Sequence, residues 1–173
     1  MRCHGALLEV GRLGVLLLGP SGVGKSECAL ELVRRGHRLV ADDVVEIERN
    51  EAGEAVGRAV ARLGHHMEIR GLGILSVPDL FGPEAVRDSA RVDLICRLDP
   101  PEQGREYERV GIERPTEQLV DVAIPRVILP ARPGGNIATV VEAAARDEQL
   151  RRAGTNAAAR LDQRLRREMG EPG

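Results

Sequence analysis

The chain has 173 residues, enough for one domain with a substantial core, and its 42% hydrophobic and 30% charged residues are an ordinary soluble balance. A net charge of −2 argues against nucleic acid or an anionic membrane as partner, and the presence of one Phe, one Tyr and no Trp argues against a base-stacking surface. No stretch predicts a membrane span or a signal peptide. The three cysteines are widely separated, which is typical of reduced thiols, so we expect a cytoplasmic protein with Cys28 and Cys96 inside.

The first half of the chain predicts strands and loops around one helix. In chain order we expect a hairpin of residues 5–10 and 13–18, turned at residues 11–12, and a helix at residues 25–35. Two further strands follow at residues 38–47 and 55–61, and then a strand-loop-helix unit at residues 65–81. Gly36 is a typical stop for the helix.

The second half predicts two strand regions and two helices. Residues 92–98 alternate as a strand does, residues 99–118 are polar and predict a mobile loop, and residues 120–129 predict a strand in two pieces broken at Pro125. A Pro/Gly turn over residues 130–136 precedes the helices, which we expect at residues 137–152 and 155–169. With the glycine-rich phosphate-binding pattern (P-loop) at residues 19–26, these elements predict the fold class α/β, a single P-loop domain with a mixed sheet.

A glycine-rich loop between the second strand and the first helix fits the phosphate-binding pattern G-x-x-x-x-G-K-[S/T]. Strand, loop and helix in this order aim backbone N–H groups at bound phosphate, whereas the glycine order does not fit a dinucleotide fingerprint. Lys25 is the only lysine of the chain, and it stands where a flexible point charge must reach a phosphate. The alternative interpretation of the loop is a glycine-rich turn that binds no ligand. The predicted nucleotide-binding residues are Gly19, Pro20, Ser21, Gly22, Val23, Gly24, Lys25 and Ser26.

Carboxylates and a hydroxyl near the loop predict the remaining chemistry. The Ser26 hydroxyl suits Mg²⁺, or it caps the helix. Asp42 and Asp43 end an apolar strand, and only one of them can face the nucleotide unless the strand has ended there. Glu68 and Arg70 share one face of an extended segment, and a surface ion pair is the alternative for them.

Three further residues are weaker candidates. Arg109 in the polar loop and Arg132 in the Pro/Gly turn could clamp a transferring phosphoryl group, although most of the 24 arginines must be solvated surface residues. His4 precedes the hairpin and could place an imidazole beside the loop, but a lone histidine is more often structural or exposed.

Seven short stretches together carry more information than the phosphate loop alone. In chain order they are Cys3-His4-Gly5, Gly19 to Glu27, Arg35-Gly36-His37-Arg38-Leu39-Val40-Ala41-Asp42-Asp43, Met67-Glu68-Ile69-Arg70-Gly71-Leu72-Gly73-Ile74, Leu80-Phe81-Gly82, Glu108-Arg109-Val110-Gly111 and Pro130-Ala131-Arg132-Pro133. They resemble the HPr kinase/phosphorylase family, also called HPr(Ser) kinase, from about residue 3 to about residue 155. The third and fourth stretches are the most specific.

The resemblance implies an enzyme that works in both directions. It would transfer a phosphoryl group from ATP or pyrophosphate to a serine of the phosphocarrier protein HPr, and remove it with inorganic phosphate. It implies catalytic roles for His4, Lys25, Arg109 and Asp43, with Asp43 as general base, and Mg²⁺ held by Ser26 and Glu68. It also implies a fold like the nucleotide-binding core of phosphoenolpyruvate carboxykinase, and a homohexamer.

The same resemblance gives the remaining candidates their context. Asp42, Arg70, Gly71 and Gly73 lie in its two most specific stretches, and residues 67–77 look like the signature for both reactions. Residues 130–135, with Arg132, look like the stretch tied to dephosphorylation.

Two departures from the family pattern affect these expectations. The family usually has a domain ahead of His4, so we expect residues 1–173 to form the catalytic domain alone. Gly135 stands where the family pattern usually has arginine, which predicts weaker phosphorylase than kinase activity. A small-molecule P-loop kinase and a non-catalytic ATP-sensing module stay open as alternative functions.

Overall fold

A six-stranded mixed sheet forms the centre of the computed structural model, which describes residues 1–100, 106–132 and 134–169. Strands β3, β10 and β12 are parallel to one another, while β2, β4 and β11 run antiparallel to their neighbours. The strand order is β11 (Thr116–Leu119), β12 (Val122–Pro130), β10 (Leu94–Asp99), β3 (Leu13–Leu18), β2 (Ala6–Val10) and β4 (Arg38–Ala41). The mixed sheet with helices confirms the predicted α/β class.

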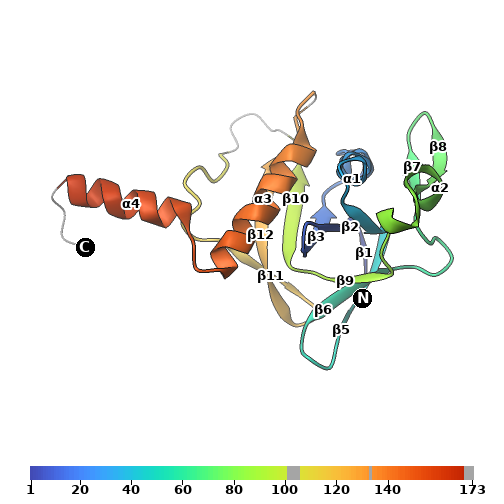
Figure 1. Ribbon diagram of the computed structural model, residues 1–173, viewed down its shortest axis with the longest axis horizontal. Helices are drawn as coiled ribbons and strands as arrows, with labels where there is room; N and C mark the ends of the chain where they lie inside the picture. Colours follow the sequence, from blue (N-terminus) through green and yellow to red (C-terminus); the bar gives the residue numbers. More distant parts are fainter. Residues whose placement is uncertain (101–105, 133, 170–173) are drawn as a thin grey trace.

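A second, antiparallel sheet and a separate hairpin complete the strands (Figure 1). The order in the second sheet is β1 (Arg2–His4), β5 (Val44–Arg49), β6 (Ala55–Ala59) and β9 (Ser89–Arg91). The hairpin consists of β7 (His66–Ile69) and β8 (Gly73–Ser76) and leads directly into the short helix α2 (Val77–Phe81) and a 3₁₀ turn at Pro83–Ala85.

The central sheet has helices on one face and the second sheet on the other. Helices α1 (Lys25–Arg34) and α3 (Ile137–Arg152) bury Cys28, Leu32 and Val141 in one apolar cluster with alternate strand residues such as Leu8, Leu17 and Cys96. The intervening residues Leu7, Leu16 and Ile95 form the second cluster with Val45 and Ile47 of β5. Because neighbouring strand residues point to opposite faces, the apolar runs of these strands fill both layers.

Helix α4 (Ala157–Glu168) extends away from this body and buries none of its side chains (Figure 1). Its Asn156 cap accepts a hydrogen bond from Ala159 N–H, as expected for an N-cap residue. Among the described residues no helix has the length and apolarity that crossing a membrane requires.

Most predicted elements are confirmed to within about two residues, but four predictions are wrong. Residues 38–47 form two strands in different sheets, because the chain turns at Asp43, where φ is 68°. Residues 73–76, predicted as loop, form β8. Pro125 does not break β12: Arg126, next to it, donates to the Pro115 carbonyl, so the nitrogen of Pro125 faces away from β11 and no bond to that strand is lost.

The polar region is also partly structured. Residues 116–119 of the predicted loop form β11 instead, paired with the start of β12. The parts of the loop and turn predictions that fall on residues 101–105 and on Pro133 lie outside the described residues.

Candidate active site

The phosphate loop connects buried strand β3 to helix α1, as predicted. Its glycines have backbone angles that other residues rarely adopt, with φ of 148° at Gly19 and 101° at Gly24. A Cβ at Gly19 would lie only 2.3 Å from the Leu98 carbonyl oxygen, so the loop must pass this strand with no side chain. Gly24 gives α1 no side-chain cap, which leaves the first amides of the helix available to an anion.

Lys25 is folded back over this loop. Its ammonium donates to the carbonyls of Gly19 at 2.9 Å and Pro20 at 3.0 Å. Both acceptors are uncharged, so a phosphate oxygen can compete for the same protons without breaking an ion pair. The guanidinium of Arg70 lies near the loop as well, with Nη2 3.7 Å from where a Cβ of Gly22 would be.

Asp42 is buried beneath the start of α1, with only 4% of its surface exposed. The Ser26 hydroxyl donates to its Oδ1 at 3.1 Å, while Oδ2 is buried without a hydrogen-bond partner. Burial raises the pKa of this carboxyl to about 6, against the opposing hydrogen bond from Ser26. A buried carboxylate oxygen without a partner and a neighbouring hydroxyl are oxygen ligands of the kind that a hard divalent cation binds.

Asp43 faces the same cavity as Asp42, because strand alternation fails where its φ becomes positive. The sequence interpretation allowed only one of the pair to face the site unless the strand ended, and the strand does end, at Ala41. The side chain of Asp43 is 70% exposed, and its Oδ1 lies 3.7 Å from His4 Nδ1. An exposed carboxylate beside an imidazole is accessible to a substrate hydroxyl.

His4 reaches this position from strand β1, an element that the sequence analysis did not anticipate. The register of β1 on β5 places His4 opposite Val44, and the next residue, Gly5, donates its N–H to the Asp43 carbonyl at 3.0 Å. The predicted hairpin of β2 and β3 is confirmed, but pairing with β5 is what brings the imidazole to Asp43.

The exposed residues Glu68 and Arg70 alternate with buried Met67 and Ile69, which confirms their predicted shared face. Both line a cavity of about 470 Å³ at the phosphate loop. Gly71 and Gly73 turn the hairpin with φ near 90°, and a Cβ there would meet nothing within 4 Å, so they serve the turn rather than a close approach. The full lining is His4, Gly19, Ser21, Gly22, Gly24, Lys25, Ser26, Glu27, Asp42, Asp43, Glu68 and Arg70.

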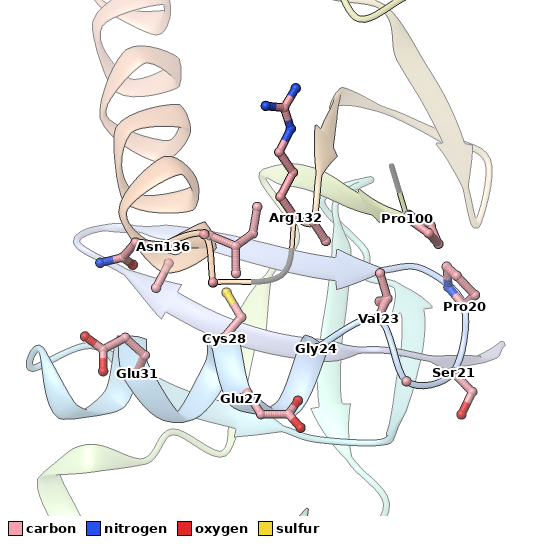
Figure 2. Close-up of a pocket in the computed structure, with 16 residues that line it drawn as sticks. Pro20, Ser21, Val23, Gly24, Glu27, Cys28, Glu31, Pro100, Arg132 and Asn136 are labelled. Carbon is pink, nitrogen blue, oxygen red and sulfur yellow. The ribbon is translucent and has the colours of Figure 1, made fainter. Parts of the chain in front are cut away.

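A second cavity of about 840 Å³ borders the same loop on the side of α1 and α3 (Figure 2). Arg132, Gly135, Asn136 and Cys28 are among the residues that line it. Sequence reasoning did not identify Glu27, Cys28, Glu31 or Asn136 as site residues. Such residues are common in helices and at their ends, and only the packing of α1 against α3 brings these four to one cavity.

Arg109 is the one predicted catalytic residue that lines neither of these cavities. It is exposed in a turn where the Glu108 carboxylate accepts N–H groups from Val110 at 2.7 Å and Gly111 at 2.9 Å. Those backbone bonds hold the pKa of Glu108 below its usual value. The role of Arg109 therefore stays a prediction.

No three His, Cys, Asp or Glu side chains converge as a metal site within residues 1–100, 106–132 and 134–169. A Mg²⁺ ion at Ser26, Asp42 and Glu68 would therefore need phosphate oxygens or water among its ligands, which is how proteins usually hold this ion.

Comparison with known proteins identifies the family. Residues 1–165 match the model of the HPr Serine kinase C-terminal domain. The HPr kinase/phosphorylases of Bacillus licheniformis and Leptospira biflexa are 48% and 49% identical to the chain over 94% of its length, which corresponds to 52% and 51% of theirs. The HPr(Ser) kinase/phosphatase structure from Coxiella burnetii superimposes with a TM-score of 0.82 at 31% identity, covering 89% of this chain and 93% of that one.

The chain spans about half the length of the curated relatives it matches. The family match, by contrast, covers nearly all of the chain, and the structural match shows the same fold. The chain therefore belongs to the HPr serine kinase C-terminal domain family.

Proposed function

We propose that this chain transfers a phosphoryl group from ATP, or from pyrophosphate, to a serine of the phosphocarrier protein HPr or a homologue, and removes it again with inorganic phosphate. The observation that carries the proposal is the 470 Å³ cavity, which Lys25 and the phosphate loop share with Asp43. Phosphate-binding groups and a carboxylate accessible to an acceptor hydroxyl thus face one space. The names of the relatives point to the same activity.

In the kinase direction, the loop amides, Lys25 and Arg70 bind and orient the donor phosphates. Asp43 accepts the proton of the serine hydroxyl as its oxygen bonds to the γ-phosphorus, and the bond from that phosphorus to the bridging oxygen breaks, releasing ADP. The imidazole of His4 lies beside this carboxylate, with Nδ1 3.7 Å from Oδ1 of Asp43.

The reverse reaction uses the same groups. An oxygen of inorganic phosphate bonds to the phosphorus of phosphoserine, and the bond from that phosphorus to the serine oxygen breaks. Protonated Asp43 returns its proton to the serine oxygen, and the products are serine and pyrophosphate. One carboxylate thus acts as base in one direction and acid in the other.

Ser26, Asp42 and Glu68 would hold Mg²⁺ together with the donor phosphates, since the Oδ2 atom of Asp42 has no partner in the structure. When bound, Mg²⁺ supplies positive charge against the phosphate oxygens. We further propose that the protein acts in the cytoplasm as a homohexamer, with a core like that of phosphoenolpyruvate carboxykinase.

Incubation with Mg-ATP and purified HPr, followed by mass spectrometry, tests the proposal. We expect phosphoserine on HPr, its loss on addition of inorganic phosphate, and no phosphoserine with Lys25→Ala. ATP hydrolysis or tight ATP binding without phosphoserine would instead favour the small-molecule kinase or the ATP sensor.

A further inference from the structure

Arg35 ties the C-terminal end of α1 to the start of α3 through three hydrogen bonds, and a fourth holds it to its own helix. Its Nη1 donates to Glu142 Oε2 at 2.7 Å and to Thr139 Oγ1 at 2.9 Å, and its Nη2 donates to Asn136 Oδ1 at 3.1 Å. Its Nε donates to Glu31 Oε1 on its own helix at 2.9 Å. One guanidinium fork therefore connects two helices whose residues are about a hundred positions apart.

His37, which lies between α1 and β4, links this connection to the turn between β2 and β3. Its Nδ1 accepts the N–H of Gly11 at 3.2 Å, so the proton of the neutral ring lies on Nε2, which is 2.7 Å from Glu142 Oε1. Glu142 thus has a separate partner for each oxygen, and its side chain is only 20% exposed. The carboxylate that receives Arg35 is fixed in place.

The connection ends at the wall of the larger cavity. Asn136 is the N-cap of α3, where its Oδ1 also accepts the Thr139 N–H at 3.2 Å. Asn136 and Gly135 line the 840 Å³ cavity from this side, and Glu31 and Cys28 line it from α1 (Figure 2). The distance between these two walls therefore depends on Arg35.

The linings of the two cavities indicate which end of a nucleotide each one takes. Lys25, Arg70 and the loop line the smaller cavity and suit phosphates, and its carboxylates include Asp42 and Glu68, which are proposed to hold Mg²⁺. The larger cavity shares Glu27 and has Glu31 on α1, and hydrogen bonds from Arg34 and Arg35 lower the pKa of Glu31 to about 2, so it is ionised at neutral pH. In Figure 2 the side chain of Arg132 extends away from α1.

The remaining lining of the larger cavity is largely apolar, and it includes Val23, Cys28, Ala131, Ile137 and Ala138. Apolar walls with a few polar groups suit a nucleobase and ribose. Both cavities are lined by Ser21, Gly22 and Gly24, so a nucleotide with its phosphates on the loop can extend from one into the other.

We propose that the larger cavity takes the nucleoside end of the phosphoryl donor, and that Arg35 is a positioning residue that sets its width by holding the start of α3 against α1. The inference rests on the proposed function, because ATP is the ligand. Arg35 does not line the cavity that takes the phosphates. Its loss should therefore weaken binding of the nucleoside and leave binding of the phosphates unchanged.

Titration calorimetry with ATP and with tripolyphosphate, each with Mg²⁺, tests the proposal because the second ligand has the phosphates without a nucleoside. For Arg35→Ala we expect ATP affinity to fall about tenfold, as for the loss of one or two charged hydrogen bonds, and tripolyphosphate affinity to stay within about twofold. Arg34→Ala is the matched control: Arg34 also bonds Glu31 but is 70% exposed and has no bond to α3 among those described, so both affinities should be unchanged.

Arg35→Lys provides the test if the alanine variant fails to fold, since one ammonium cannot bridge Asn136, Thr139 and Glu142 as the fork does, and ATP should again be the ligand that weakens. Equal loss for ATP and tripolyphosphate, or unchanged ATP affinity in a folded Arg35 variant, would overturn the inference. Wild-type protein that binds neither ligand would instead count against the proposed function.

Discussion

Asp42 is a residue at which stability and function oppose each other. Burial raises the pKa of its carboxyl from 3.8 to about 6, so the folded protein binds this proton more tightly than the unfolded chain does. The stabilisation from that proton is complete below pH 3.8 and is lost as pH rises through about 6. At neutral pH the buried carboxylate is therefore a cost to the ligand-free protein, which a cation near Oδ2 would offset.

We predict that Asp42→Asn stabilises the ligand-free protein at pH 7.5, because the amide has no charge to desolvate. The gain is on the order of 2 kcal/mol, or several degrees in Tm, and it should shrink at pH 4.5, where wild-type Asp42 is protonated. Thermal unfolding at both pH values measures it, with Asp43→Asn as the exposed neighbour that should show no such gain. A variant less stable than wild type at pH 7.5 would contradict this reading of Asp42.

Gly135 leads to a prediction about the direction of the reaction. It lines the larger cavity, and a Cβ there would lie 3.0 Å from the Arg132 carbonyl oxygen, which calls only for a small local shift. Since the family pattern usually has arginine here, Gly135→Arg should restore a cation for inorganic phosphate bound on Ser21, Gly22 and Gly24, the loop residues that both cavities share. Phosphate-dependent dephosphorylation should then be faster by a factor of about ten, the effect of roughly one charged hydrogen bond. Release of pyrophosphate from phosphoserine-HPr measures it, and equal rates in the variant and wild type would reject the prediction.

At the scale of elements, Asp93 joins α3 to the strands that support the site. The carboxylate is buried, with 4% of its surface exposed, and accepts Gly14 N–H at 2.9 Å, Arg91 Nε at 2.6 Å and Arg152 Nη1 at 2.6 Å. A buried carboxylate with three donors holds β3, β9 and α3 together, and its removal leaves the Gly14 amide without a partner.

Asp93→Ala should therefore lower the free energy of unfolding by about 3 kcal/mol, as for a buried charge network that loses its centre. Asp162→Ala is the matched control: its bond to Arg166 on α4 is an exposed i,i+4 pair, so its loss should cost less than about 0.5 kcal/mol. Urea denaturation of both variants gives the comparison. If the two substitutions have equal effects, Asp93 does not have this joining role.

Local patterns predicted the elements well wherever the residues themselves fix the conformation. The phosphate loop, helix α3 and the hairpin of β2 and β3 follow from glycines, helical periodicity and apolar runs. The corner at Asp43 could not be read from the sequence, because nothing in an apolar run ending in two aspartates shows that the next residues join another sheet.

The contacts of the candidate site were predictable only where strand alternation decides them. Glu68 and Arg70 had to share a face, and they do. The unpartnered Oδ2 atom of Asp42 and the bonds from Arg35 to Asn136 and Glu142 depend on how helices pack on the sheet. No local signal specifies a contact between residues 35 and 142.

At the scale of the whole molecule, the expected homohexamer can be tested directly. One chain has a mass of 18.7 kDa, so sedimentation at micromolar concentration should give about six times that value. A mass that stays at one chain over a broad concentration range would contradict the hexamer while leaving the site chemistry untouched.

The central claim is that one cavity joins a phosphate-binding loop to a general base, Asp43. Single-turnover formation of phosphoserine on HPr by Asp43→Asn, with Mg-ATP affinity measured on the same variant, tests it most directly. We predict a rate lower by a factor of about 10² to 10⁴ with ATP affinity within about twofold of wild type, because the variant keeps the loop and loses the base. A rate equal to that of wild type would contradict the account.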